Sequence, residues 1–214
     1  MTRARRSDGD ITRTKILETA GKLIAKNGYA QTSSKAVSQA AGVDLASINY
    51  HFGGREGLYL AVLSAAHKHF MDGSELKALV ESGLPPEEKF CTFIDMLVHR
   101  VKSGADWHSL VFFREIFSPS VTLTNFIESE GMEKIAGVRK IICEVTLLPE
   151  DNPGSLLCML SVIAPCLMLM VAGKRLPGPI RTISALEDQI IAEHFKCFAL
   201  AGMKAVAAQI KSSC

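Results

Sequence analysis

The densest run of polar side chains at regular spacing is DLASINYHFGGR, residues 44–55. Hydroxyl, amide, imidazole and guanidinium groups are interspersed there with apolar residues. Val43, Ile48 and Phe52 fall on one side of a helix, and we expect Phe52 to belong to the core. The polar groups then lie on the other faces, where they can contact base edges and phosphates in a major groove. The pattern favours a helix that reads a DNA duplex.

The other histidines and the cysteines form no pattern that predicts catalysis or metal binding. His67 and His69 stand two residues apart, which places them on different faces of a helix and disfavours a shared metal ion. No Ser/His/Asp or Cys/His grouping is evident in the sequence. The six cysteines lie far apart without a CxxC pair, as expected for reduced core thiols. We therefore predict a protein that is not an enzyme, with no catalytic residue, no cofactor and no metal.

Positive charge is concentrated near the N-terminus. Residues 1–57 contain nine Lys and Arg against five Asp and Glu, a net charge of +4, whereas the rest of the chain carries −2. This asymmetry indicates a polyanionic partner for the N-terminal segment, and a solvated basic face is the alternative. Arg3, Arg5 and Arg6 precede the first predicted helix. They could follow the DNA backbone or the minor groove, or form a solvated tail.

Three short helices are predicted around the polar run. The first covers residues 16–27 and is stopped by Gly28. The second begins after Ser33 and the third after Asp44, and both of these residues are good N-caps. Gly53 breaks the third helix.

The connection AGVD between the second and third helices contains Gly42, which suits a left-handed backbone. A helix, a short turn and a helix over residues 34–52 have the spacing of a helix-turn-helix.

Helical spacing continues through the rest of the chain, and strand-like alternation is scarce. Further helices are expected at about 56–71, 85–102, 107–117, 122–147, 156–172 and 184–211. The sequence thus predicts an all-α protein of about nine helices. We expect a helix-turn-helix DNA-binding domain at 1–57 and a larger helical effector-binding and dimerisation domain at 58–214.

The segment 156–172 is apolar enough to raise the question of a membrane span. It is short for a bilayer and contains Pro165, so a buried helix is the better interpretation. The charged N-terminus has no apolar stretch typical of a secretion signal. We expect a cytoplasmic protein without a membrane partner.

The stretch GYAQTSSKAVSQAAGVDLASINYHFGGREGLY, residues 28–59, resembles the signature of the TetR family of bacterial transcriptional repressors. The shared elements are Gly28-Tyr29, Thr32-Ser33, Ala41-Gly42-Val43, Tyr50-His51-Phe52, Arg55-Glu56 and Leu58. In the larger half, REIFSPS at 114–120 and LCMLSVI at 157–163 resemble the CecR-like branch.

The resemblance implies a homodimeric repressor, associated with the bacterial nucleoid, that binds a palindromic operator on double-stranded DNA. Carried over by position, the DNA-contacting residues are Ser34, Lys35, Leu45, Ala46, Ser47, Asn49, Tyr50, His51 and Arg55. Arg55 stands where the family usually has Lys, and either residue can hold a phosphate. Asn49 departs from the usual tyrosine, so a stacked aromatic contact is in doubt there.

The larger half is rich in methionines and aromatic residues, which suit a pocket for a lipophilic small molecule. The resemblance also implies such an effector. Candidate lining residues are Trp107, Phe113, Phe117, Met159, Cys166 and Met170. Plain core packing is the alternative for each of them.

The last two predicted helices, 156–172 and 184–211, resemble the pair that forms the family's dimer interface as a four-helix bundle. An apolar stripe with small residues on the last helix would permit close contact between subunits, and a stripe facing its own core is the competitor. Two other functions remain open. The body could be a protein-interaction platform without an effector, or the chain could be an enzyme or lipid carrier whose helix-turn-helix resemblance is accidental.

Overall fold

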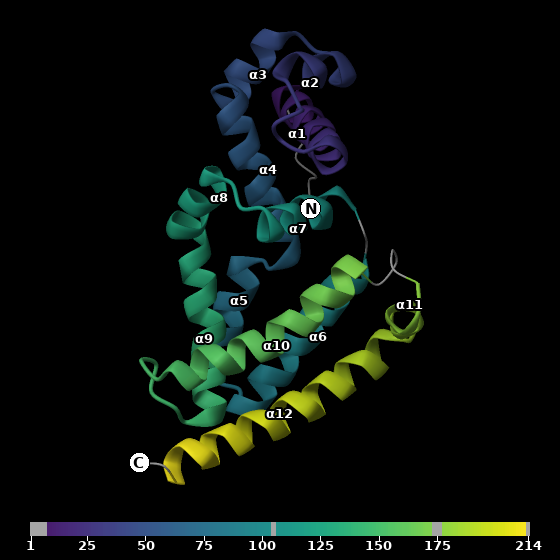
Figure 1. Cartoon of the computed structure of the whole chain (residues 1–214). Helices are drawn as coiled ribbons and strands as arrows, with labels where there is room; N and C mark the ends of the chain where they lie inside the picture. The colour runs from purple at the N-terminus through teal and green to yellow at the C-terminus, as the bar shows by residue number, and fades with distance from the viewer. Residues whose placement is uncertain (1–7, 104–105, 173–176, 213–214) are drawn as a thin grey trace, which may run out of the picture. The chain divides into compact units, whose positions relative to one another are not determined.

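The computed structural model describes residues 8–103, 106–172 and 177–212 (Figure 1). Within these ranges every regular element is helical, with twelve α-helices and one π-helix. The all-α prediction is confirmed, but about nine helices was too few. The additional short helices are α5 (Gly73–Val80), α8 (Val121–Phe126) and α11 (Pro179–Ser184).

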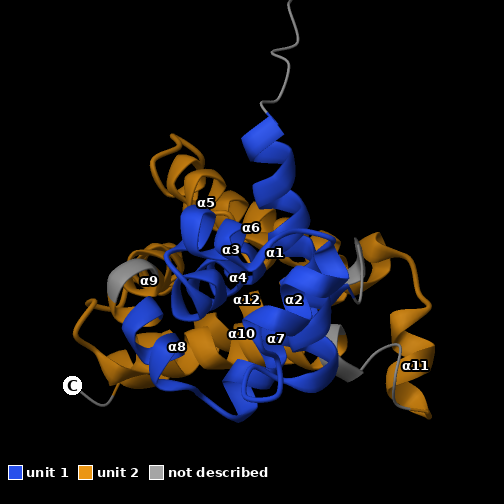
Figure 2. Cartoon of the chain, turned by 90° about the horizontal axis from the view of Figure 1, so that it is seen from above, with its two compact units in different colours: residues 1–67, 106–126 blue, residues 68–105, 127–214 orange. Residues whose placement is uncertain are grey.

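The chain forms two compact units (Figure 2). The described part of unit 1 comprises residues 8–67 and 106–126, and that of unit 2 comprises 68–103, 127–172 and 177–212. Two later helices are therefore grouped with the three N-terminal helices, residues 8–52, which we call the head. The boundary predicted at residue 57 lies inside unit 1. The functional division into 1–57 and 58–214 stays a prediction.

The described part of unit 1 contains six helices, of which one continues into unit 2. They are α1 (Asp8–Asn27), α2 (Ser34–Ala41), α3 (Leu45–Phe52), the first part of α4 (Arg55–Phe70), α7 (Trp107–Phe117) and α8. Ile16, Val37 and Ile48 are fully or almost fully buried. They lie on α1, α2 and α3, so each of the three helices of the head contributes apolar side chains to its core.

The turns of the head follow the sequence signals. Gly28 and Gly42 have φ values of 86° and 61°, the left-handed region that glycine adopts without steric cost. The hydroxyl of Ser33 accepts a hydrogen bond from the N–H of Ala36 at 3.1 Å and caps α2, as predicted. Asp44 occupies the N-cap position of α3, but its side chain makes no capping hydrogen bond.

Unit 2 contains the end of α4 and a larger group of helices. They are α5, α6 (Pro86–Ser103), the π-helix η1 (Ile127–Gly131), α9 (Met132–Thr146), α10 (Pro153–Ala172), α11 and α12 (Asp188–Ser212). Its core includes Phe90 and Phe93 on α6 and Ile141 and Ile142 on α9, all at most 1% exposed. The helix predicted over 122–147 is divided, because a π-helical turn separates α8 from α9.

The apolar segment 156–172 lies within α10, which contains Pro165. Cys158, Val162 and Cys166 recur at every fourth residue and are buried, whereas Leu157 and Leu160 are exposed. The expectation of a buried helix is therefore correct for one face only. None of the helices in the described ranges combines the length and apolarity that a membrane span needs.

Candidate nucleic-acid interface

Helix α3 separates its apolar anchor from its exposed face. Ile48 is completely buried against the head, whereas Leu45 is 48% exposed and Tyr50 is 86% exposed. Ala46 and Asn49 are also exposed, and Ser47 and His51 are half-buried. This face combines small, apolar and hydrogen-bonding side chains, which is what contact with base edges and phosphates requires.

Two further predicted contacts lie at the start of α2. Lys35 is exposed, and Ser34 is half-buried in the first turn of the helix. The first turn of α2 contains no acidic side chain. Its backbone N–H groups and the Lys35 ammonium together favour an anion such as a phosphate. Arg3, Arg5 and Arg6 lie outside the described residues.

Arg55 makes contacts that the sequence did not reveal. Its Nη2 donates hydrogen bonds to the carbonyl oxygens of Tyr29 at 2.6 Å and Ala30 at 3.3 Å. Its Nε donates to the carbonyl oxygen of Thr32 at 3.1 Å, and the guanidinium carbon lies 4.4 Å from the centre of the Tyr29 ring. Arg55 thus ties the start of α4 to the α1–α2 turn. Its planar fork permits this set of bonds, which a lysine could not reproduce.

Phe52 differs from its predicted place in the core. It is half-buried, and the guanidinium of Arg13 on α1 lies 5.0 Å from the centre of its ring. Phe52 is the last residue of α3, and its ring remains accessible to the guanidinium of Arg13. No sequence pattern indicated this cation–π pair, because the two residues are far apart along the chain.

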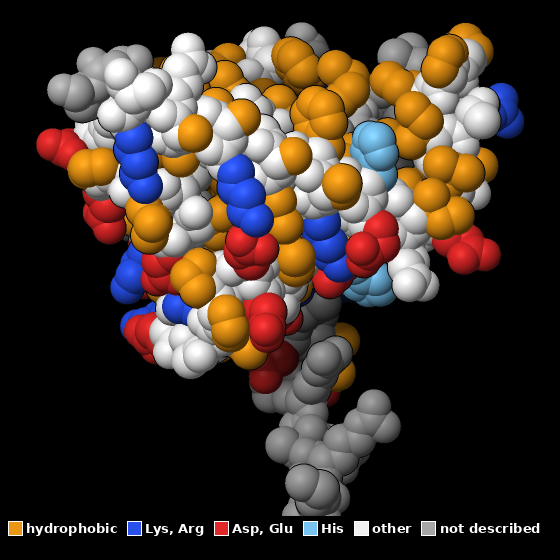
Figure 3. Space-filling view, turned by 90° about the horizontal axis from the view of Figure 1, so that it is seen from below, with side chains coloured by type: hydrophobic (Ala, Val, Ile, Leu, Met, Phe, Trp, Pro, Cys, Tyr) orange, Lys and Arg blue, Asp and Glu red, His pale blue; other side chains and the backbone are white. Residues whose placement is uncertain are grey.

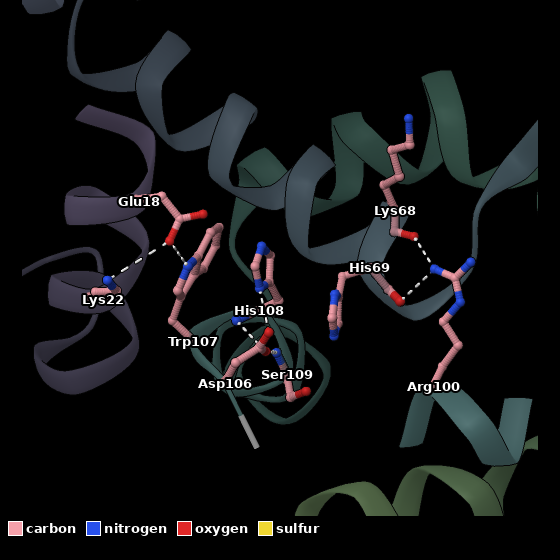
Figure 4. A network of polar contacts seen from close by, with 9 residues as sticks. All are labelled: Glu18, Lys22, Lys68, His69, Arg100, Asp106, Trp107, His108 and Ser109. Carbon is pink, nitrogen blue, oxygen red and sulfur yellow. Dashed lines mark hydrogen bonds and ion pairs between the residues drawn. The ribbon is translucent and has the colours of Figure 1, made fainter. Parts of the chain in front are cut away.

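Three of the candidate effector-lining residues lie on α7 in unit 1. Trp107 is buried, and its Nε1–H donates to a Glu18 carboxylate oxygen on α1 at 2.8 Å (Figure 4). Phe113 is also buried, but Phe117 is 73% exposed. Trp107 therefore packs against α1 of the head, and Phe117 lies at the surface.

The other three candidates lie on α10 in unit 2. Met159 is half-buried and Cys166 is buried. Burial raises the pKa of the Cys166 thiol to about 12, which keeps it neutral and unreactive. The side chain of Met170 lies outside the described residues. The lining of an effector site by these six residues stays a prediction.

The carboxyl end of α4 is held within unit 2 by Arg100 of α6 (Figure 4). Arg100 Nη1 donates to the carbonyl oxygen of His69 at 3.1 Å, and Nη2 contacts a Glu75 carboxylate oxygen at 2.5 Å. A cation at the carboxyl end of a helix satisfies carbonyl groups that have no partner within the helix. Sequence reasoning missed Arg100, because only the packing of α6 places it there.

Comparison with protein families finds two matching models. The model described as "Bacterial regulatory proteins, tetR family" matches residues 16–62. The model described as "HTH-type transcriptional dual regulator CecR, C-terminal domain" matches residues 86–203, more than half of the chain. Comparison with curated proteins finds no match.

Several solved structures of regulators have a similar fold. A TetR family transcriptional regulator, PfmR from Thermus thermophilus, has a TM-score of 0.62 and 19% identity, over 87% of this chain and 97% of that chain. FadR from Bacillus subtilis in complex with stearoyl-CoA has a TM-score of 0.66 and 15% identity, over 88% and 98%.

AibR in complex with isovaleryl coenzyme A and operator DNA has a TM-score of 0.64 and 17% identity, over 86% and 96%. At such identities these structures show the fold alone. The two family models carry the assignment, and they agree with the exposed polar face of α3. The chain belongs to the TetR family of DNA-binding transcriptional regulators, with a C-terminal domain of the CecR type.

Proposed function

We propose that the protein is a dimeric repressor that binds a palindromic operator through residues 34–52 and releases it on binding a small lipophilic effector. The observation that carries the DNA-binding part is the exposed face of α3. Ile48 anchors the helix, while Leu45 and Tyr50 project from it. Leu45 and Ala46 suit contact with thymine methyl groups, and Asn49 suits an adenine edge or a phosphate.

The dimer is supported by the exposed apolar side chains of α10 and α12. Leu157 and Leu160 on α10 are exposed, as are Ile190 and Phe198 on α12, where Phe198 is 75% exposed. In the surface view of Figure 3, hydrophobic side chains (orange) gather along the upper part of the face, and most charged side chains lie below them. Exposed apolar surface of this kind typically marks an interface between subunits.

Helix α12 divides its apolar residues between a buried side and an exposed side. Ala192, Met203 and Ala207 are buried in unit 2, whereas Ile190 and Phe198 lie on the opposite side of the helix and are exposed. A Cβ added at Gly202 would meet no other atom within 4 Å, so the chain itself leaves room beside this helix. The outward face is the one we assign to the second subunit.

The effector is proposed to be an acyl-CoA or a molecule with a similar acyl chain. Support comes from two regulators of the same fold, which were solved with stearoyl-CoA and with isovaleryl coenzyme A. The two heads of the dimer must stand ~34–36 Å apart to enter successive major grooves. An effector that binds better at another head spacing lowers operator affinity, with a typical coupling of ~1–3 kcal/mol.

A second candidate is a regulator whose body is a protein-interaction platform without an effector. Phe117 and Val121 favour it, because they are 73% and 79% exposed. A groove in unit 2 between α5 and α9 has a volume of about 200 Å³, less than the ~300–1,000 Å³ of a typical ligand pocket. An effector site predicts that an added acyl-CoA lowers operator affinity, whereas an interaction surface predicts no change in operator affinity.

The first test is selection of a palindrome from random DNA, followed by binding over a salt series. Lys35→Ala should weaken binding and reduce the salt slope by about one per head, because one phosphate contact is lost. Lys140→Ala, an exposed lysine of α9, is the control and should leave the slope unchanged. If no sequence is enriched, the operator proposal is wrong.

The second test measures the operator Kd with and without stearoyl-CoA and isovaleryl-CoA, and the acyl-CoA Kd with and without operator. An effector must weaken DNA binding by the same factor by which DNA weakens effector binding. An operator Kd that neither acyl-CoA changes, and an acyl-CoA Kd that the operator does not change, would contradict release by either acyl-CoA. This result would favour the interaction platform.

A further inference from the structure

Unit 1 contains a buried polar network that the DNA-contacting residues do not include. Tyr59 of α4 is 1% exposed and donates its phenol O–H to Oε1 of Glu115 on α7. Glu115 is 5% exposed, and its Oε2 accepts hydrogen bonds from the N–H of Ser120 at 3.0 Å and from its hydroxyl at 2.7 Å. Polar groups this deeply buried are costly unless they are satisfied, so the partners must keep their relative positions.

The other side of Tyr59 faces the α1–α2 turn. Its ring stacks on that of Tyr29, with centroids 3.9 Å apart and planes inclined by 9°. Tyr29 in turn carries the Arg55 guanidinium on its ring. We call the series Ser120, Glu115, Tyr59, Tyr29 and Arg55 the Tyr59–Glu115 network. Burial and the neighbouring Glu115 raise the pKa of Tyr59, so its phenol remains a hydrogen-bond donor at neutral pH.

One end of this network, Arg55, is the first residue of α4 and follows closely after α3 in the chain. Helix α3 ends at Phe52 and α4 begins at Arg55. The two residues between them, Gly53 and Gly54, have φ values of 72° and 116°. Because this connection is so short, the position of the start of α4 fixes the direction in which α3 ends.

Toward the other end of the network, Glu115 lies on α7, which is also held against α1. Trp107 donates to Glu18, as described above, and its indole occupies the space that a side chain at Gly21 would need. Near the other end of α7, the guanidinium of Arg114 lies against Gly28. Helix α7 therefore contacts α1 at Glu18 and Gly21, the α1–α2 turn at Gly28 and α4 at Tyr59, all within unit 1.

We propose that Glu115 is a positioning residue for DNA recognition, which holds Tyr59 and thereby the start of α4 at the angle at which α3 fits the major groove. The corner between α7 and α8 then sets operator affinity without contacting DNA. This inference rests on the proposed reading of an operator by α3. It adds that a residue on α7 controls the angle at which α3 enters the major groove.

The test uses Tyr59→Phe and Glu115→Gln in the full chain. The matched controls in unit 2 are Thr146→Val, which removes a buried hydroxyl, and Glu144→Gln, which alters the carboxylate paired with Lys89 at 3.0 Å. All variants are compared at a temperature where unfolding is negligible. Operator Kd is measured over a salt series, and hydrogen–deuterium exchange is followed by mass spectrometry in the free protein.

Both network variants should weaken binding to the selected palindrome by about 5-fold or more, within the usual range of coupling between sites. The salt slope should stay that of the wild type, because no phosphate contact is removed. Exchange should rise at residues 28–33 and 53–58 as well as at 115–121. The unit 2 controls should leave Kd and these exchange rates unchanged.

Two results would overturn the proposal. One is a wild-type Kd in both network variants despite a lowered Tm, which would make the network purely structural. The other is faster exchange confined to 115–121. If both variants fail to fold, Ser120→Ala decides by the same readouts; it removes the hydroxyl bond to Glu115 and the bond that this hydroxyl accepts from the N–H of Leu123 at 3.1 Å. If the wild type selects no palindrome, the operator proposal fails, while the exchange pattern still decides whether Glu115 positions the head.

Discussion

The indole Nε1–H of Trp107 donates a hydrogen bond to the carboxylate of Glu18 at 2.8 Å, and so joins α7 to α1 across 89 residues of sequence. Trp107 is the single tryptophan of the chain. Its position reflects a glycine on α1, because a Cβ at Gly21 would overlap the indole ring. Trp107, which the sequence suggested as part of an effector pocket, thus packs against α1, and its place in an effector site stays a prediction.

This contact predicts the effect of filling the space at Gly21. Gly21→Ala should lower the free energy of unfolding by ~1–3 kcal/mol, as overpacking of a close contact does. It should also change Trp107 fluorescence, since the indole must move. In a Trp107→Ala background the same substitution should be neutral or stabilising, because alanine favours a helix over glycine. Equal losses in both backgrounds, measured by chemical denaturation, would show that the indole is not the obstacle.

Arg55 allows its structural role to be separated from a role in phosphate binding. Arg55→Lys keeps the positive charge but loses the fork that bonds the carbonyl oxygens of Tyr29 and Thr32. We expect a loss of ~1 kcal/mol in unfolding free energy with an unchanged salt slope of DNA binding. Arg55→Ala should lower both quantities. An Arg55→Lys protein as stable as the wild type would mean that the carbonyl contacts contribute nothing measurable.

Asp72 predicts a pH dependence at the start of α5. Its carboxylate accepts hydrogen bonds from the N–H of Ser74 at 2.9 Å and from its hydroxyl at 2.5 Å. These bonds, chiefly that from the hydroxyl, lower the pKa of Asp72 from 3.8 to about 2. A carboxyl group whose pKa is depressed by folding stabilises the fold above its unfolded pKa. That contribution is lost as pH falls through the folded pKa.

The matched variant is Asp72→Asn, which can cap the helix but does not titrate. The stability of the wild type relative to Asp72→Asn should be constant above about pH 4 and should decrease between about pH 4 and pH 2. Urea denaturation at several pH values measures this difference. Parallel curves for both proteins down to pH 2 would mean that the folded state does not shift the Asp72 pKa.

Phe198 predicts where the second subunit binds. Phe198→Glu places a charge on the exposed face of α12 and should shift the protein from dimer to monomer in analytical ultracentrifugation. The far-UV circular dichroism of the variant should stay that of the wild type, since Phe198 contributes little to the core of its own unit. Val121→Glu in unit 1, equally exposed, is the control and should remain a dimer. A dimeric Phe198→Glu protein would exclude this face as the interface.

Local signals in the sequence were sufficient for the helix-turn-helix. Gly28, Ser33 and Gly42 each specify a turn or cap through their own backbone preference or side-chain bond, and such effects act over a few residues. Helical periodicity likewise identified Ile48 as buried and left Leu45 and Tyr50 exposed. For these reasons the class of fold and the exposed face of α3 could be predicted from the sequence, together with the family.

Only the tertiary structure showed how distant side chains are used. The carbonyl contacts of Arg55, the packing of Trp107 on α1 and the bond from Tyr59 to Glu115 join residues 23 to 89 positions apart. Periodicity can show that a residue is buried but not which partner it meets, because many chain positions share the same apolar or polar character. The residues that we propose to read DNA were therefore accessible from local patterns. Those that we propose to hold α3 in place depend on how helices far apart in sequence pack together.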